Sequence, residues 1–187
     1  MTAATRRLVL IRHGRTALNR EDRLRGLADP PLDEVGESQA AALVPTMAAL
    51  EVAVVLCSPL IRAVRTGSMI AAGIGVPVHS DPRFTDRDYG PWTGALRQEV
   101  VDRFGRVDAA PGVEPVESVL TRVRPAIDAV LDEHDGTVAV VTHDAVIRPL
   151  LAELAPGLGP VRAPNGSWND LVRRAGVWEV QDFDRLP

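Results

Sequence analysis

The sequence predicts an α/β fold, a three-layer sandwich in which helices cover both faces of a mostly parallel central sheet, with an antiparallel hairpin at the C-terminal edge. Three observations predict it. Short, continuous apolar runs, typical of strands buried on both faces, recur along the chain. Helical patterns separate these runs, and strands that alternate with helices form parallel sheets through right-handed crossovers. The C-terminal segment carries the pattern of two strands joined by a tight turn.

The expected elements follow one another along the chain. The apolar runs are Leu8–Ile11, Val52–Cys57 and Thr137–Thr142. The helical patterns cover Glu37–Leu50, Leu60–Ala72 and Ser118–His134. The hairpin consists of Trp168–Arg173, a turn at Ala175-Gly176, and Val177–Phe183.

The organisation of the chain predicts a single domain over residues 1–187, because this length suits one domain and no repeat or interdomain linker is visible. Asp108–Pro115 is an expected loop, too short to be a linker. The Trp168 and Trp178 side chains of the hairpin could pack on the chain's own core or pair across a dimer, so monomer and homodimer both stay open.

Composition excludes several classes of function. A formal net charge of −4 argues against a nucleic-acid binder that depends on overall basicity. A lone cysteine, Cys57, excludes an intramolecular disulfide and a Cys-rich zinc site. No apolar run approaches the roughly 18 residues that cross a bilayer, and the run before Arg12 is too short for a signal peptide. We therefore expect a cytoplasmic protein without a membrane partner.

Polar clusters follow the three apolar runs. Arg12–Thr16 (RHGRT) comes after the first run, Ser58–Arg62 (SPLIR) after the second, and His143-Asp144 after the third. Because ligands bind beyond the carboxyl ends of parallel strands, we expect two histidines and two arginines to meet in one cleft.

The residue types in these clusters favour a phosphate pocket that contains a nucleophile. The planar guanidinium of Arg12 or Arg62 suits bidentate binding of phosphate, although Arg62 could instead form a surface ion pair. Gly14 permits close approach of the backbone to a ligand, and a helix that begins after each cluster would direct N–H groups at an anion. Histidines beside arginines form a poor cation site, so no metal is expected. His79 and His134 lack such a neighbourhood and are expected to be structural.

Five segments carry recognisable motifs, and they are Leu8–Asn19, Gly26–Ala40, Cys57–Thr66, Arg83–Gly94 and Val138–Arg148. In these segments and in their order the chain resembles the histidine phosphatase superfamily, which includes the phosphoglycerate mutases, and the resemblance extends over most of the chain.

The resemblance implies a role for each matching residue. His13 would be the nucleophile and become phosphorylated. Arg12, Arg62 and His143 would bind the phosphoryl oxygens, and Asn19 would add a hydrogen bond. Flanking arginines agree with these roles, since they lower the pKa of a histidine and stabilise charge in the transition state. No cofactor is required.

The acid that protonates the leaving oxygen is implied to be Asp86, where the family usually has glutamate. Asp88 is the nearest alternative, and Asp144 could be a second acid. Asp144-Ala145 stands where many relatives carry Gly-Gly, and its backbone N–H can still face the phosphate. Thr93 stands at a position where the family's Gly-x-Trp-Glu-Gly motif carries glutamate.

The leading function is a phosphomonoesterase that acts on a small phosphorylated metabolite through phosphohistidine on His13. A mutase of the phosphoglycerate type is the alternative enzyme, and a non-catalytic phospholigand-binding protein is a third. Hydrolysis is favoured because the chain leaves little room for an insertion between Thr66 and His143. The substrate itself is not identified by the sequence.

Specificity would reside in the loops Arg20–Asp33 and Gly105–Glu117. Arg23, Arg25 and Arg106 in these loops could meet a second anionic group, but for each alone a solvent-facing position is the expectation.

Overall fold

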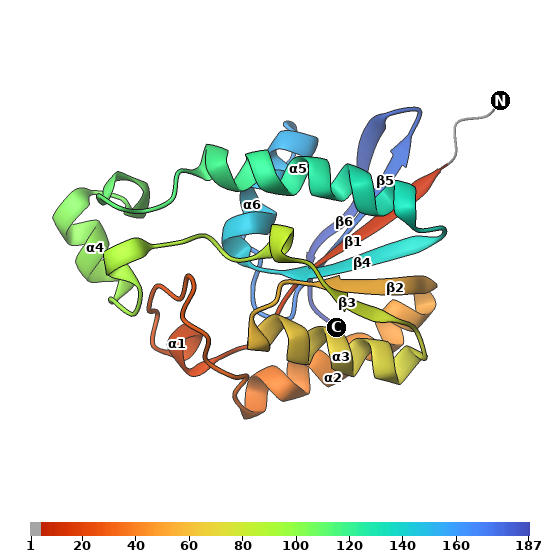
Figure 1. Ribbon diagram of the computed structural model, residues 1–187, viewed down its shortest axis with the longest axis horizontal. Coiled ribbons are helices and arrows are strands. Elements are labelled where there is room, and N and C mark those ends of the chain that lie inside the picture. The colour runs from red at the N-terminus through yellow and green to blue at the C-terminus, as the bar shows by residue number, and fades with distance from the viewer. Residues whose placement is uncertain (1–4) are drawn as a thin grey trace.

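The computed structural model describes residues 5–187 and contains a six-stranded sheet in the order β3-β2-β4-β1-β5-β6 (Figure 1). The strands are β1 Arg6–Arg12, β2 Val52–Cys57, β3 Val78–Ser80, β4 Thr137–Thr142, β5 Trp168–Arg174 and β6 Val177–Arg185. The helices are α1 Ala17–Arg20, α2 Glu34–Ala49, α3 Ile61–Ile74, α4 Arg97–Phe104, α5 Val116–Glu133 and α6 Asp144–Leu154.

The pairing of the strands confirms the predicted sheet. β4 lies between β1 and β2 and is parallel to both, and β3 is parallel to β2. β5 runs antiparallel to β1, and β6 runs antiparallel to β5 at the edge. Trp178 packs against the chain's own core rather than projecting away from it.

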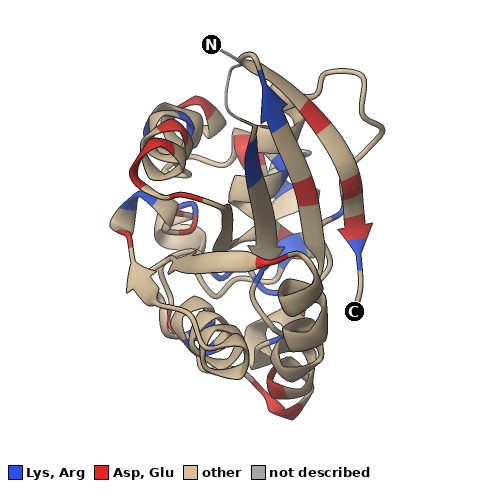
Figure 2. Cartoon of the chain, turned by 90° about the vertical axis from the view of Figure 1, so that its right-hand side faces the viewer, with Lys and Arg blue, Asp and Glu red and all other residues tan. Residues whose placement is uncertain are grey.

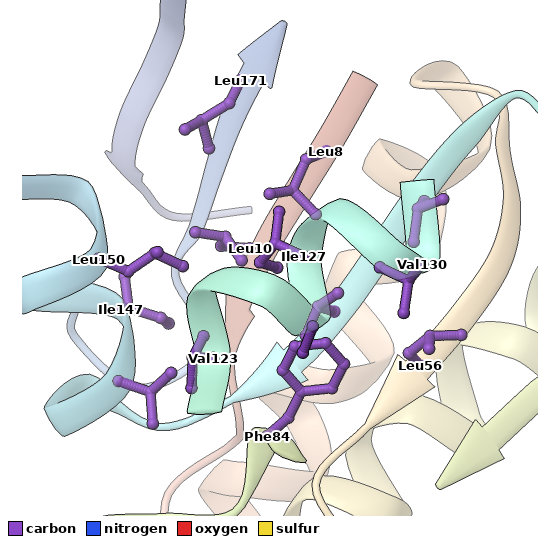
Figure 3. Packing of buried hydrophobic residues seen from close by; sticks show 14 of the residues in the cluster. Leu8, Leu10, Leu56, Phe84, Val123, Ile127, Val130, Ile147, Leu150 and Leu171 are labelled. Carbon is purple, nitrogen blue, oxygen red and sulfur yellow. The ribbon is translucent and has the colours of Figure 1, made fainter. Parts of the chain in front are cut away.

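Helices cover both faces of this sheet, which gives the expected three layers (Figure 1). Alternate residues of β1 point to opposite faces, as the period of a strand requires. Leu8 and Leu10 pack beneath α5 and α6, where Figure 3 shows them facing Ile127 of α5. Val9 and Ile11 pack against α2 and α3 on the other face.

The ends of α2, α3 and α5 differ from the predicted bounds by one to three residues, and two of these ends have a clear local reason. α2 begins at Glu34 rather than Glu37, because the Asp33 carboxylate caps the helix by accepting a hydrogen bond from the Gly36 N–H at 2.9 Å. α3 continues to Ile74 and stops at Gly75, which adopts φ 75°.

A lobe that contains α4 lies beyond the carboxyl ends of the parallel strands, at the left of Figure 1. It has a small core of its own, formed by Leu24, Tyr89, Val100, Val107 and Ala110. The sequence did not predict α4. Within residues 5–187, no helix combines the length and the apolar character needed to cross a membrane.

Candidate active site

The structure brings His13, His143 and Arg62 together at the carboxyl ends of β1, β4 and β2. The two imidazole rings lie 5.0 Å apart between centroids. Nε of Arg62 lies 3.3 Å from Nε2 of His13. All three side chains are fully buried. The expected convergence is therefore seen for both histidines and for Arg62, and the second arginine, Arg12, lies against Asp144 at the start of α6.

The hydrogen bonds of His13 define its tautomer. Nδ1 lies 2.6 Å from the carbonyl oxygen of Gly14, which can only accept, so Nδ1 carries the proton. Nε2 accepts from Arg62 and therefore holds the lone pair. Burial lowers the pKa of His13 well below its ordinary value, and the charge of Arg62 lowers it further. The ring is therefore neutral, and its two hydrogen bonds fix its orientation.

Arg62 is locked by main-chain carbonyls as well as by His13. Nη1 donates to the oxygen of Ala28 at 2.7 Å, and Nη2 donates to the oxygen of Gly26 at 2.9 Å. Nη2 also donates to Oδ2 of Asp86 at 2.9 Å. Arg62 is thus a fixed, buried cation rather than a surface ion pair.

Asp86 lies beside both Arg62 and the second histidine. Its Oδ2 is 3.5 Å from Nδ1 of His143, and its Oδ1 accepts from the Arg87 N–H at 2.8 Å. Burial raises the pKa of Asp86, against the attraction of Arg62. A carboxyl group in this environment can hold a proton that an exposed aspartate would release.

Ser58 contacts His143, a role that the sequence did not indicate, although Ser58 directly follows the predicted strand Val52–Cys57. Nε2 of His143 lies 2.8 Å from Oγ of Ser58. Burial lowers the pKa of His143 well below its ordinary value, and Arg62 adds to the effect. Ser58 therefore orients a neutral ring.

Arg25 is the main correction to the sequence analysis. It does not face solvent: it is 7% exposed, and its Nη2 donates to Oδ1 of Asp144 at 2.7 Å. Nη2 of Arg12 lies 3.4 Å from the same oxygen. The sequence offered no signal for Arg25 because its partner lies 119 residues further along the chain.

Asp144 is an anion in this arrangement. Burial alone raises the pKa of its carboxyl, but Arg12 and Arg25 outweigh burial and hold that pKa well below the usual range. The pKa of Asp144 is thus shifted in the opposite direction from the pKa of Asp86, which burial raises.

Three buried nitrogen atoms around this site lack a hydrogen-bond partner among the described residues. They are Nε of Arg12, Nε of Arg25 and Nδ1 of His143. Buried polar atoms usually have partners, so these three nitrogen atoms are suited to a ligand that accepts hydrogen bonds. An oxyanion has that chemistry.

Asn19 and Asp88 serve local structure. Oδ1 of Asn19 accepts from the Thr16 N–H at 3.0 Å and closes the cap of α1. Oδ1 of Asp88 accepts from the Gly90 N–H at 2.7 Å and holds a turn. The hydrogen bonds found for either side chain do not include one to His13 or Arg62.

Gly14 permits a close approach, but the approach is to the chain itself rather than to a ligand. A Cβ atom on Gly14 would lie 2.3 Å from the carbonyl oxygen of Gly36, at the start of α2. The Gly14 N–H donates to Oγ1 of Thr66 at 3.1 Å. These contacts fix the backbone on which His13 sits.

Residues 5–187 contain no group of three or more histidine, cysteine, aspartate or glutamate side chains arranged to hold a metal ion. His79 lies exposed on β3, and His134 follows α5. Cys57 is a buried free thiol.

A buried, neutral histidine beside arginines, beyond the carboxyl ends of the strands of an α/β sheet, is the arrangement of a phosphoryl-transfer site. The chain belongs to the histidine phosphatase superfamily (branch 1), whose family model matches residues 8–185.

Curated relatives carry phosphatase names. Glucosyl-3-phosphoglycerate phosphatase of Mycobacterium tuberculosis is 31% identical over 207 residues, covering 97% of this chain and 91% of the relative. Phosphoserine phosphatase 1 of Hydrogenobacter thermophilus is 32% identical over 159 residues, covering 79% and 75%. The chain spans only 43% of a bifunctional protein of M. tuberculosis, to which it is 34% identical over 156 residues.

Solved structures share the fold. A mycobacterial glucosyl-3-phosphoglycerate phosphatase in complex with VO3 has a TM-score of 0.86 at 26% identity, covering 96% of this chain and 98% of that one. A phosphoglycerate mutase of Bacillus anthracis has a TM-score of 0.88 at 22% identity, covering 98% and 94%, and this likeness supports the fold alone.

Proposed function

We propose that this protein is a phosphomonoesterase that hydrolyses a small phosphorylated metabolite through a phosphohistidine on His13. One observation carries the proposal: a buried, neutral His13 presents Nε2 to the guanidinium of Arg62, and the same guanidinium holds Asp86. Arg62, the cation for the phosphoryl group, thereby holds both the proposed nucleophile His13 and the proposed acid Asp86 in place.

In the first step, Nε of Arg62 moves its hydrogen bond from Nε2 of His13 to a phosphoryl oxygen. The lone pair that this frees on Nε2 attacks phosphorus, and the ester P–O bond breaks. The bonding electrons leave on the ester oxygen, which takes a proton from the carboxyl group of Asp86. Arg12, Arg62 and His143 bind the phosphoryl oxygens and stabilise their charge. Arg25 joins this set, because its buried Nε has no other partner among the described residues.

In the second step, water attacks phosphorus and the P–N bond to His13 breaks. The water proton passes to the carboxylate of Asp86, which restores the acid, and inorganic phosphate leaves. Asp144 has no proton to donate in the first step, because its arginine partners keep it ionised, and its lowered pKa makes it a weak base for the second step. Asp88 is committed to the Gly90 N–H. Asp86 is therefore our choice of acid, and a hydrogen bond from Asn19 to the phosphoryl group stays a prediction.

Hydrolysis is favoured over a mutase reaction because relatives named as phosphatases align over three quarters or more of their own lengths. The test is product analysis with 3-phosphoglycerate and p-nitrophenyl phosphate, in EDTA, for the wild type and His13→Ala. We expect inorganic phosphate from the wild type alone. An isomerised ester would indicate a mutase. Binding without turnover would indicate a non-catalytic protein. Activity that is lost in EDTA and restored by zinc or magnesium would indicate a metal-dependent enzyme.

Several broader features of the protein are also proposals. A single domain over residues 1–187 agrees with one sheet that spans the described chain. A cytoplasmic location agrees with Cys57 as a free thiol, and the net charge of −4 agrees with a partner other than nucleic acid. The protein would work as a monomer or a homodimer.

A further inference from the structure

A cavity of about 600 Å³ lies between the lobe that contains α4 and the first turns of α6. Asp144 lines it, and the Asp144 carboxylate also contacts Arg12 and Arg25 of the proposed phosphoryl pocket. The cavity therefore adjoins that pocket. Its volume falls within the range of small-molecule sites, roughly 300–1,000 Å³.

Three arginines that line the cavity have little or no compensation from acidic side chains. Across residues 5–187, neither Arg106 nor Arg148 forms an ion pair, and the nearest acidic partner of Arg97 is Asp22 at 4.0 Å. The Asp22 side chain is 74% exposed, so water screens its charge.

The two carboxylates that line the same cavity are already neutralised. Asp108 forms an ion pair with Arg87, and Asp144 forms one with Arg25. The cavity is thus electropositive, although the chain carries a net charge of −4. Figure 2 shows acidic and basic residues interspersed along the helices and outer strands of the cartoon, and the net charge of −4 means that a generally basic chain does not explain the cavity's arginines.

The remaining wall of the cavity is largely apolar. It is formed by Val101, Val107, Val116, Pro149, Leu158 and Val161. A ligand of small-metabolite size that fills this cavity would therefore need two parts, an uncharged part against the apolar wall and an anionic group against the arginines.

We infer that this cavity receives the leaving group of the phosphate ester and that this leaving group carries a second anionic group, a carboxylate or another phosphate. Arg97, Arg106 and Arg148 bind that second anion. The inference rests on the proposed function for the reaction, but binding alone can test it. It narrows the substrate class to phosphate esters with two separated anionic groups.

The experiment measures binding by titration calorimetry in the His13→Ala background, where turnover is blocked. 3-Phosphoglycerate against glycerol 3-phosphate tests a carboxylate, and fructose 1,6-bisphosphate against fructose 6-phosphate tests a second phosphate. We expect the doubly anionic member of at least one pair to bind about tenfold more tightly or better, as charge-assisted hydrogen bonds provide.

The variant Arg106→Gln/Arg148→Gln should abolish that preference and leave the singly anionic ligands within about twofold. Arg174→Gln is the matched control, because Arg174 is exposed and lies far from the cavity. Its neighbour Arg173 lies opposite Arg6 in the antiparallel pairing of β5 with β1, at the end of β1 away from His13. This control should keep the preference.

Equal binding within both pairs, or a preference that survives in Arg106→Gln/Arg148→Gln, would overturn the inference. The proposed function fails separately, if the wild type does not hydrolyse p-nitrophenyl phosphate while the binding preference is present.

Discussion

Nη2 of Arg62 donates a hydrogen bond to Oδ2 of Asp86 at 2.9 Å, and both side chains are buried. Nε of the same guanidinium faces Nε2 of His13 at 3.3 Å. The planar guanidinium therefore fixes the separation between the proposed nucleophile and the proposed acid.

The acid role of Asp86 predicts a dependence on the leaving group. Asp86→Ala should slow hydrolysis of an alkyl phosphate by roughly 10²–10⁴-fold, because an alkoxide must be protonated as it leaves. Hydrolysis of p-nitrophenyl phosphate should slow far less, since its phenolate leaves without a proton. Steady-state rates of both esters measure this difference.

Asp88→Ala and Asp144→Ala are the controls for that comparison. A residue that only supports the structure slows both esters by similar factors. A leaving-group difference in Asp88→Ala or Asp144→Ala, with equal losses in Asp86→Ala, would move the acid role to that other residue.

The two pKa shifts predict the pH dependence of kcat/KM. The lowered pKa of His13 keeps the ring neutral, with a lone pair on Nε2, well into the acidic range, so activity is lost only when pH falls below that lowered value. The raised pKa of Asp86 means that the acid loses its proton as pH rises through a value above the ordinary one for aspartate. We expect an alkaline loss in the wild type with an alkyl phosphate. Asp86→Asn should remove that limb on the same substrate, and an unchanged limb would contradict the assignment.

The pair of Arg25 and Asp144 predicts strong coupling in stability. Arg25→Ala should lower the free energy of unfolding by about 3–5 kcal/mol, because it removes one partner of a buried ion pair. Urea denaturation of Arg25→Ala, Asp144→Asn and the double variant gives the coupling energy. We expect about 0.5–3 kcal/mol, and additive effects would show that the pair does not act as a unit.

The contact between Gly14 and Gly36 predicts that Gly14→Ala destabilises the protein. The added Cβ would meet the backbone carbonyl of Gly36 at 2.3 Å, and a backbone cannot yield as a side chain does. We expect a loss of about 1–3 kcal/mol in the free energy of unfolding. Gly157→Ala is the control, because a Cβ there meets nothing within 4 Å; it should stay within about 0.5 kcal/mol. Equal stability of the two variants would be the contrary result.

The parts of the fold that depend on local pattern could be predicted from the sequence. Val52–Cys57 and Thr137–Thr142 are strands with the predicted bounds, since a continuous apolar run needs burial on both faces. β3 was missed because three exposed residues at an edge carry no such pattern. α4 was missed because its lobe has only a small core.

Some features of the candidate site could likewise be predicted from the sequence, and others could not. The grouping of His13, Arg62 and His143 follows from strand ends, which topology brings together. Arg25 is buried because it pairs with Asp144, which is distant in the sequence, and the residues around Arg25 in the sequence do not predict that contact. The orientation of His13 by the Gly14 carbonyl likewise requires coordinates.

The most direct test of the account is whether His13 carries the phosphoryl group during turnover. The wild type and His13→Ala should be mixed briefly with ³²P-labelled substrate, quenched in base, and mapped by peptide analysis. Folding of His13→Ala is checked by urea denaturation. The account predicts an acid-labile, base-stable phosphoryl group on the peptide that contains His13 in the wild type, and none in His13→Ala. Equal labelling of the two proteins, or a label on another residue, would contradict it.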